Sequence, residues 1–161
     1  MSAIETARLL LRRWQDDDLE RLGALYADPQ VARFLSVDGR PWPRERSIGA
    51  FGHFRRQWQE RGFGPWAAVD KASSRWLGQI GLNELPRWPG PQKVEVGWEL
   101  HREFWGRGLA TEGGRAGLLV TGGLPPVPPT GRPSVPLFPP FDEGTGHRPS
   151  RPIATSPSLH T

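Results

Sequence analysis

The chain has 161 residues, a formal net charge of +4 and no cysteine. This length suits one ordinary domain, and the lack of cysteine excludes disulfides and thiolate metal ligands. All but two of the 21 basic residues are arginine, and they are scattered along the chain, so we expect no nucleic-acid partner. The leucine run at 9–11 is too short for a signal peptide or a membrane span, which predicts a cytoplasmic protein without a membrane partner.

The first elements in chain order are a short strand and a helix. The segment "ARLLLRRW", residues 7–14, predicts the strand, and the helix that follows starts at Asp17. Glu20 stands three residues after Asp17, which is the spacing of a capping box. Leucines then recur at helical spacing until Asp28-Pro29, a pair that ends the helix.

A second helix is predicted over residues 43–62. Pro43 suits the first turn of a helix, and Gly62 suits the position just after its last turn. The apolar residues of this segment recur every three or four positions and should face the core. They are Ile48, Phe51, Phe54 and Trp58.

Three strands come next. Residues 64–70 and 75–85 predict a hairpin around the turn "KASS". Residues 93–100 alternate between apolar side chains and a second face that carries Glu95 and Glu99. The order strand, two helices, three strands and a third helix indicates an α+β fold with a mostly antiparallel sheet.

A glycine loop, "WGRGLATE", joins the last of these strands to the third helix. Gly106 and Gly108 let successive backbone N–H groups converge on one point, and the helix adds its own free N–H groups and its dipole. This combination suits a phosphate or pyrophosphate, and Arg107 could add a charged contact. A plain strand-to-helix turn is the alternative interpretation.

Residues 6–117 resemble a known family, the GCN5-related N-acetyltransferases (GNAT). The resemblance is carried by "ARLLLRRW", "DPQVARFL", "RGFGPWAAVDKASSRWLGQIGL" and "VEVGWELHREFWGRGLATEGGRA". It points to the group that includes ribosomal-protein alanine acetyltransferases. The family signature [QR]-x-x-G-x-[GA] falls on residues 105–110, where Gly108 and Ala110 match and Trp105 departs from Gln or Arg.

The resemblance implies a three-layer fold in which helices flank a mixed, mostly antiparallel sheet. It implies acetyl-CoA as the cosubstrate and direct acetyl transfer to an amine, on a protein N-terminus or a small molecule. The loop would hold the pyrophosphate, and the residues concerned are Gly106, Arg107, Gly108, Leu109, Ala110 and Thr111. The histidines lack paired ligand spacing, so we expect no metal.

The resemblance also implies a carboxylate base near the substrate cleft. Glu95 is the first choice and Glu99 the second, because both lie on one face of the strand 93–100. Glu84, at the end of the preceding strand, is a further candidate. Each glutamate could equally be an exposed strand residue. Trp42 is expected either to line the acceptor pocket or to pack as a hydrophobic staple on the second helix.

The third helix is expected to be weak. Gly113, Gly114 and Gly117 each lower helix stability by about 1 kcal/mol relative to alanine. Glu112, in the first turn, is expected to interact favourably with the helix dipole. The resemblance is not readable beyond residue 117.

The composition changes sharply near residue 121. We predict a partial domain at 6–120 and a disordered tail at 121–161, which holds eleven of the 18 prolines. The C-terminal strands of the family would then be missing, as in a truncated or frameshifted chain, and acetyl transfer would be impaired. The alternative is a non-catalytic remnant that serves as a CoA-binding or protein-interaction module. The oligomeric state is left open.

Overall fold

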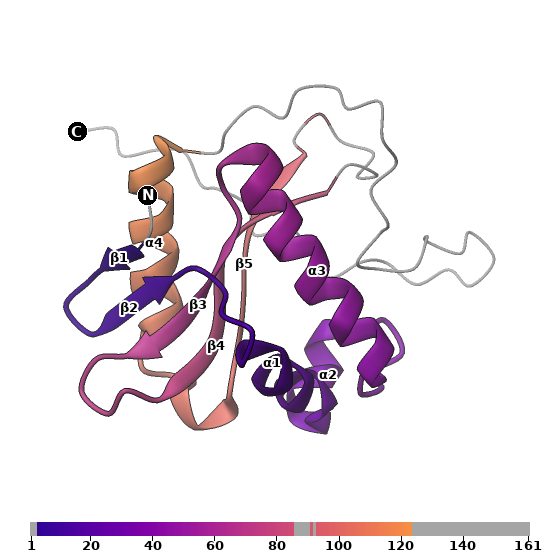
Figure 1. Cartoon of the computed structure of the whole chain (residues 1–161). Coiled ribbons are helices and arrows are strands. Elements are labelled where there is room, and N and C mark those ends of the chain that lie inside the picture. Colours follow the sequence, from indigo (N-terminus) through magenta and orange to yellow (C-terminus); the bar gives the residue numbers. More distant parts are fainter. Residues whose placement is uncertain (1–2, 86–90, 92, 124–161) are drawn as a thin grey trace.

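The computed structural model describes residues 3–85, 91 and 93–123. In this part of the chain, five strands form one antiparallel sheet in the order β1-β2-β3-β4-β5 (Figure 1). The strands are β1 (Ala3–Glu5), β2 (Leu9–Arg12), β3 (Pro65–Asp70), β4 (Trp76–Glu84) and β5 (Val94–Leu100). Of the tail predicted at 121–161, Thr121 is the last residue of a helix, and residues 124–161 lie outside the described residues, as does the expected loss of C-terminal strands.

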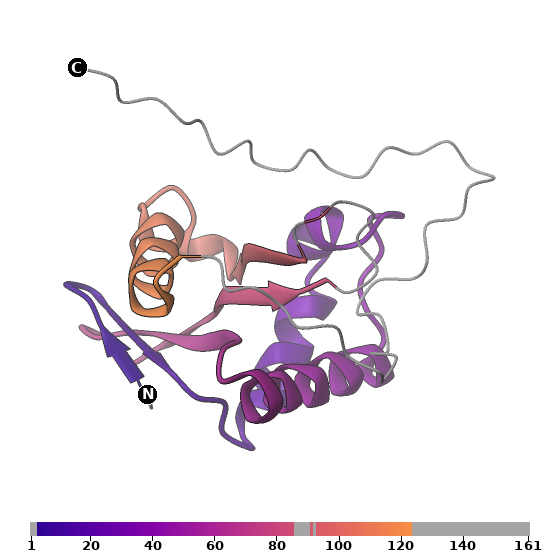
Figure 2. The same cartoon turned by 90° about the horizontal axis from the view of Figure 1, so that it is seen from above.

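Helices cover both faces of this sheet. They are α1 (Asp18–Ala27), α2 (Pro29–Leu35), α3 (Arg44–Arg61) and α4 (Leu109–Thr121). Helices α1 to α3 lie on one side and α4 on the other, so the described chain has three layers (Figures 1 and 2). The predicted α+β class and the three-layer arrangement are confirmed, although every pairing among the described strands is antiparallel.

The N-terminal segment forms a hairpin where a single strand was expected. Ile4 of β1 lies opposite Leu11 of β2, and the backbone N–H of Thr6 donates to the carbonyl of Leu9 over 2.9 Å. The expected strand over 7–14 therefore shrinks to the four residues of β2. A three-residue β1 is too short to show a period of two.

The capping box predicted at the start of α1 is wrong, because it does not form. Asp17 makes no side-chain cap hydrogen bond, and Glu20 pairs with a distant arginine on the surface. The buried carboxylate is instead that of Asp18, which accepts from the backbone N–H of Gln15 over 2.9 Å. It also accepts two hydrogen bonds from the guanidinium of Arg12, at 2.6 and 2.9 Å.

Helix α2 was not expected from the sequence. Asp28 and Pro29 do end α1, but they also begin a new helix: Asp28 accepts from the backbone N–H of Gln30 over 2.8 Å, and Pro29 occupies the first turn. The helix buries Val31 and leaves 66% of Phe34 exposed. Its seven residues are too few for a helical period to stand out.

Helix α3 confirms the helix predicted over 43–62. It ends at Gly62, which adopts the left-handed conformation with φ +73°. Phe51, Phe54 and Trp58 are buried as expected, but Ile48 is 45% exposed. Ser47 is buried in its place at 1% exposure, so the buried face of α3 begins with a polar residue that the apolar spacing did not indicate.

The glycines of α4 have a packing role that the sequence interpretation missed. The helix runs through all of them to Thr121. A Cβ atom at Gly117 would lie 2.9 Å from Cζ3 of Trp66, and one at Gly113 would lie 2.7 Å from Cδ1 of Ile80. These glycines therefore allow α4 to approach the sheet closely, so their low helix propensity is offset by burial of the sheet face.

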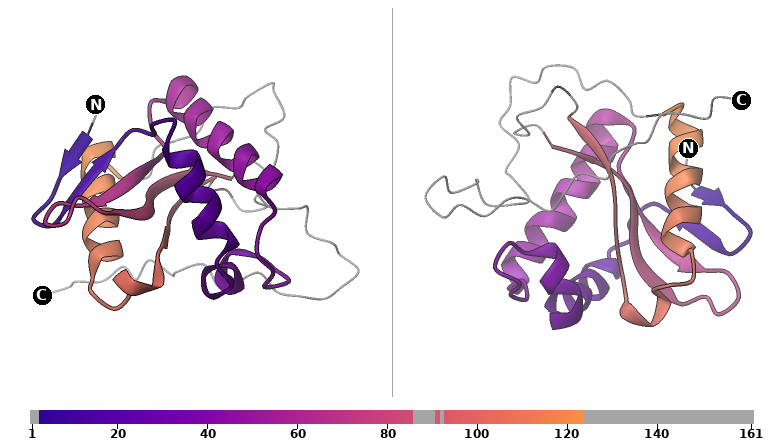
Figure 3. Two further views of the ribbon diagram at one scale, coloured as in Figure 1. Left: turned by 60° about the horizontal axis from the view of Figure 1, so that its bottom comes forward. Right: turned by 180° about the vertical axis from the view of Figure 1, so that it is seen from behind.

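Strand β5 positions the site that follows. It pairs with β4 from Gly78 opposite Leu100 to Glu84 opposite Val94, and it is the edge strand of the described sheet. Seen from behind, β5 runs between the layer of α1 to α3 and helix α4 (Figure 3). Its C-terminal end therefore opens toward both helical layers.

Candidate active site

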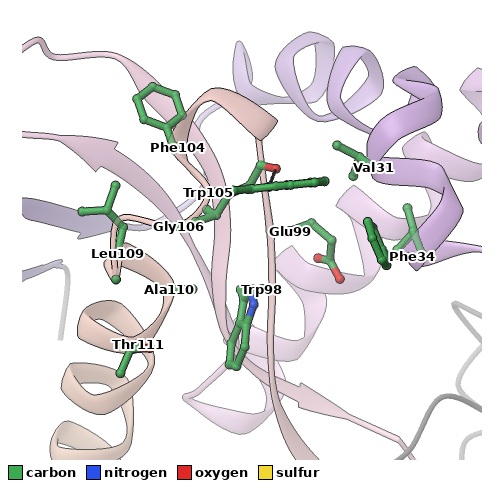
Figure 4. A pocket seen from close by; sticks show the side chains of 13 residues that line it. Val31, Phe34, Trp98, Glu99, Phe104, Trp105, Gly106, Leu109, Ala110 and Thr111 are labelled. Atoms are coloured by element: carbon green, nitrogen blue, oxygen red, sulfur yellow. Dashed lines mark hydrogen bonds between the residues drawn. The ribbon is translucent and has the colours of Figure 1, made fainter.

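A pocket of about 460 Å³ lies at the C-terminal end of β5, where the chain crosses to α4 (Figure 4). It is lined by α2, the end of β5, the segment that follows β5 and the first turn of α4. The lining residues are Val31, Phe34, Leu35, Trp98, Glu99, Leu100, Phe104, Trp105, Gly106, Gly108, Leu109, Ala110 and Thr111. Both kinds of residue singled out in the sequence, a glutamate and the glycine loop, therefore meet in one cavity.

The loop at residues 106–111 has the backbone expected of an anion site. Gly106 and Gly108 have φ of +70° and +73°, which favour glycine. The first hydrogen bond of α4 runs from the N–H of Glu112 to the carbonyl of Gly108 over 3.0 Å. The N–H groups that precede Glu112 are therefore outside the helical ladder, at the positive end of the helix dipole.

One predicted loop residue is set apart from the pocket. Arg107 is absent from its lining, and its carbonyl accepts from Nη1 of Arg8 over 2.8 Å. Nε of Arg8 also pairs with Oε2 of Glu112 at 2.7 Å. Arg8 thus ties the loop and the first turn of α4 to the start of β2, a role that the sequence did not indicate.

Glu112 forms hydrogen bonds in addition to the interaction with the helix dipole that the sequence predicts. Its Oε1 accepts from the hydroxyl of Thr6 over 2.5 Å and from the backbone N–H of Arg8 over 2.9 Å. The hydrogen bond from Thr6, followed by the contacts with Arg8, holds the pKa of this carboxyl below its ordinary value. Because Arg8 compensates the charge of Glu112, the carboxylate does not cancel the attraction of the loop for an anion.

Trp105 occupies the first position of the signature, where its indole N–H is a hydrogen-bond donor. Its Nε1–H donates to the carbonyl of Leu100 over 2.7 Å, so the ring is fixed across the end of β5. The ring meets Phe34 of α2 edge-on, with centroids 5.7 Å apart. Figure 4 shows the Trp105 ring reaching from the loop toward Val31. Trp105 and Phe34 therefore form an aromatic mouth.

Glu99 is the carboxylate of the pocket. The side-chain amide of Gln79 donates to its Oε2, and the hydroxyl of Tyr26 donates to the same oxygen over 3.4 Å. Burial raises the pKa of Glu99 to about 7, although the hydrogen bond from Gln79 opposes the shift. Figure 4 shows the carboxylate between β5 and Phe34 of α2. Neither Gln79 nor Tyr26 was singled out from the sequence as a site residue.

The other candidate glutamates lie elsewhere. Glu95 is outside the pocket lining and stands opposite Asn83 on β4; burial raises its pKa as well. Glu84 is 5% exposed and pairs with Arg61, with Nη2 and Oε1 2.9 Å apart. Glu84 is absent from the pocket lining and is held in a buried ion pair, which is a structural role.

Trp42 packs against the residue that contacts Glu99. Its ring meets the ring of Tyr26 with centroids 4.8 Å apart, and its Nε1–H donates to the hydroxyl of Ser36 over 2.8 Å. Trp42 is 4% exposed and is absent from the pocket lining. Trp42 therefore does not line this pocket, which was one of the two roles expected for it.

No group of three or more His, Cys, Asp or Glu side chains in the described part of the chain could hold a metal ion. None of the helices placed by the structure combines the length and apolar character needed to cross a membrane.

Comparison with known proteins identifies the family. Residues 8–121 match the family model described as acetyltransferase (GNAT) domain. The chain therefore belongs to the GNAT acetyltransferase family, as the resemblance indicated, and the family supports acetyl transfer as its general chemistry.

Individual relatives agree. The chain is 28% identical over 109 residues to the uncharacterized N-acetyltransferase YoaA of Bacillus subtilis, covering 68% of this chain and 60% of that protein. It is 34% identical over 115 residues to the uncharacterized protein YkkB of the same organism, covering 69% and 63%. The chain thus spans less than two thirds of the length of these relatives.

Solved structures show the same fold. An acetyltransferase from Agrobacterium tumefaciens is 28% identical with a TM-score of 0.61, covering 76% of this chain and 66% of that one. A GNAT-family acetyltransferase from Bacillus anthracis, 18% identical with a TM-score of 0.54, covers 72% and 63%. At that identity the second likeness concerns the fold alone.

Proposed function

We propose that the chain is an acetyl-CoA-dependent N-acetyltransferase that transfers the acetyl group directly to an amine. The observation that carries the proposal is the meeting of two features in one pocket. One is a glycine loop with free backbone N–H groups, and the other is Glu99, whose pKa is about 7. Transfer of an acetyl group to an amine needs both an anion site for the cosubstrate and a proton acceptor.

The loop fits the pyrophosphate of acetyl-CoA. Gly106 and Gly108 adopt the left-handed φ that other residues rarely take, and they turn the chain into the N-terminus of α4. Amides from Leu109 to Thr111 would hold the phosphate oxygens at the N-terminus of α4. When bound, acetyl-CoA would supply an activated thioester as the acetyl donor.

Glu99 is our choice of base, in place of Glu95. Amines bind as ammonium ions near neutral pH because their ordinary pKa is about 10. A carboxylate whose pKa is about 7 can accept a proton from such an ammonium and release it again within the same pH range. The amine that results has the lone pair needed to form a bond to the thioester carbon. The C–S bond would then break, and CoA would leave as a thiolate that takes up a proton.

The experiment is an acetyl-transfer assay on the full chain with acetyl-CoA and a panel of primary amines, read by mass spectrometry of the products. We expect acetylated amine from the wild type, and at least a tenfold lower rate from Glu99→Gln. Glu60→Gln, a charge loss on the exposed side of α3, serves as the matched control and should keep the wild-type rate. Equal rates for Glu99→Gln and the wild type would remove Glu99 as the base.

The same assay distinguishes the two classes of acceptor that we propose, a protein N-terminus and a small molecule. We propose the cytoplasm as the location on the sequence alone. Because the chain spans 60% of YoaA, activity of the whole relative need not extend to it. Binding of CoA without any acetylated product would favour the alternative, a non-catalytic CoA-binding module.

A further inference from the structure

The pocket has two sides of different chemistry. Figure 4 shows Leu109, Ala110 and Thr111 on one side and Val31 and Phe34 of α2 on the other, with the end of β5 between them. The first side is the start of α4, which under the proposed function receives the pyrophosphate of acetyl-CoA. The side of α2 is therefore left for the amine acceptor.

The pocket offers a ligand one negative charge. Among the lining residues that the structure describes, Glu99 alone has a charged side chain, and part of its surface is exposed. The contribution of α2 consists of Val31, Phe34 and Leu35, whose side chains cannot form hydrogen bonds. The acceptor side thus combines one carboxylate with an apolar wall, which suits a ligand with one ammonium group and an apolar body.

The large apolar side chains of this pocket are exposed. Phe34 is 66% exposed, Trp105 42% and Trp98 39%. They are three of the seven large apolar residues that are exposed in the described part of the chain, and all three line this one pocket. Single exposed apolar residues are common on protein surfaces, whereas a cluster of them marks a site of interaction.

The aromatic mouth is held in a fixed arrangement. The indole N–H of Trp105 donates to the carbonyl of Leu100 over 2.7 Å, and the Phe34 ring meets the Trp105 ring edge-on with centroids 5.7 Å apart. Because its N–H is already used, the Trp105 ring offers a ligand its apolar surface. An aromatic ring packs favourably on such a surface, and an ammonium group is attracted to the face of the indole.

A positive charge already stands beside the aromatic mouth. Cζ of Arg33 lies 4.6 Å from the centroid of the Phe34 ring. A second ammonium group on the acceptor would be repelled by this guanidinium when it reached Phe34. A neutral ring in the same place meets no such repulsion, so the surroundings of Phe34 favour an acceptor with a single positive charge.

We propose that the acceptor is a small amine with one positive charge and an apolar aryl body. The ammonium group lies at Glu99, and the aryl ring packs against Phe34 and Trp105. Burial of the ring removes apolar surface of ligand and protein from water. A polar body of the same size would lose hydrogen bonds to water without gaining partners from this wall. Phe34 is then a specificity residue, and it takes no part in proton transfer.

The test compares dissociation constants by calorimetry on the full chain at neutral pH. The probes are 2-phenylethylamine, 2-(2-aminoethoxy)ethanol, which has one ammonium on a polar body, and 1,4-diaminobutane, which has two. We expect the wild type to bind 2-phenylethylamine more tightly than either comparator by about tenfold or more. No binding of 2-phenylethylamine, or equally tight binding of either comparator, would overturn the proposal.

Phe34→Ala addresses the assigned position of the ring. Because Phe34 is largely exposed, its truncation should leave the fold intact, weaken binding of 2-phenylethylamine by about fivefold or more and change binding of 2-(2-aminoethoxy)ethanol little. Phe34→Trp keeps an aromatic surface and should retain the preference. Ile48→Ala removes another exposed apolar side chain, on α3 and outside the pocket lining, and should bind like the wild type. A preference that survives unchanged in Phe34→Ala would contradict the role of Phe34.

This substrate class rests on the proposed function, but the two fail in different ways. Selective binding of 2-phenylethylamine without any acetylated product, in the mass-spectrometric assay with acetyl-CoA, would contradict the acetyltransferase and leave the binding site in place. Acetylation of 2-phenylethylamine and of 2-(2-aminoethoxy)ethanol with equal kcat/KM would support the acetyltransferase and overturn the substrate class. Acetylation of 2-phenylethylamine with a kcat/KM that falls in Phe34→Ala, while that of the polar amine does not, would support both.

Discussion

The hydroxyl of Tyr26 donates to Oε2 of Glu99 over 3.4 Å and links helix α1 to the edge strand β5. Burial, followed by the nearby charge of Glu99, raises the pKa of Tyr26 well above its ordinary value, so the phenol stays protonated and keeps its proton for this bond. The buried Trp42 ring packs edge-on against the Tyr26 ring. The environment of the proposed base is thus set by a residue 73 positions away in the sequence.

The proposed base predicts a pH dependence of turnover. The pKa of Glu99 is about 7, so the deprotonated form decreases as the pH falls below that value. We expect kcat/KM to fall by about tenfold per pH unit on the acidic limb. Glu99→Gln should have a low rate without this limb. A limb at the same pH in Glu99→Gln would assign it to another group, and initial rates across a pH series decide.

Tyr26→Phe should move the acidic limb upward. The hydrogen bond from Tyr26 favours the charged form of Glu99 and lowers its pKa, so its removal raises that pKa. The phenyl ring keeps the packing against Trp42, which separates the effect on titration from a loss of stability. The same pH series measures the shift, and a limb that stays in place or moves downward would show that the contact has no influence on Glu99.

Gly117→Ala should destabilise the protein although alanine favours helices. The added methyl group would lie 2.9 Å from Cζ3 of Trp66, a rigid ring in the core. We expect a loss of roughly 1–3 kcal/mol in the free energy of unfolding, as for other overpacked sites. Gly49→Ala in α3, where nothing lies within 4 Å, is the control and should stabilise by roughly 0.5–1 kcal/mol. Urea unfolding measures the free energy of unfolding of both variants. If Gly117→Ala were stabilised as Gly49→Ala is, the packing role of Gly117 would be refuted.

Asp18→Asn should lower the stability of the fold at neutral pH. The carboxylate is fully buried, and it pairs with Arg12 at 2.6 Å and Arg21 at 2.9 Å. Removing one partner of a buried ion pair costs roughly 3–5 kcal/mol. Thermal unfolding at neutral pH should reveal the loss.

The same site predicts how stability responds to acid. Burial alone would raise the pKa of Asp18, but hydrogen bonds, first from Arg12 and then from the Gln15 backbone, bring it below its ordinary value of 3.8. A lowered pKa in the folded state means that the stabilisation is present at neutral pH and is lost as the pH falls through that folded value. The gap between wild type and Asp18→Asn should therefore narrow in strong acid, and a gap that widens there would contradict the sign.

Local signals in the sequence predicted the elements that have marked ends. Helix α3 was expected within one residue at each end because Pro43 and Gly62 bound it. Strand β1 and helix α2 were missed because three and seven residues carry too little periodicity. Among three consecutive aspartates, the choice of Asp17 over Asp18 as the structural carboxylate could not be made without knowing where Arg12 lies.

The same limit applies to the site. The glycine loop is a local pattern, so its position at the start of α4 was predictable. Glu95 and Glu99 share one face of a strand, and no sequence feature distinguishes them. The distinction comes from tertiary contacts, because Tyr26 and Gln79 reach Glu99 and not Glu95. The glycines of α4 were misjudged for the same reason: helix propensity is visible in the sequence, and the Trp66 ring beneath Gly117 is not.

The most direct test of the central claim is a calorimetric titration of the full chain with acetyl-CoA. Gly108→Val should bind at least tenfold more weakly than the wild type, about 1.4 kcal/mol, because a branched side chain disfavours the φ of +73° that the loop requires. Gly122→Val, at φ +70° just beyond the other end of the same helix, introduces the same strain away from the pocket and should bind like the wild type. Equal affinity of Gly108→Val and the wild type, or no binding by the wild type at all, would contradict the assignment of this loop to acetyl-CoA.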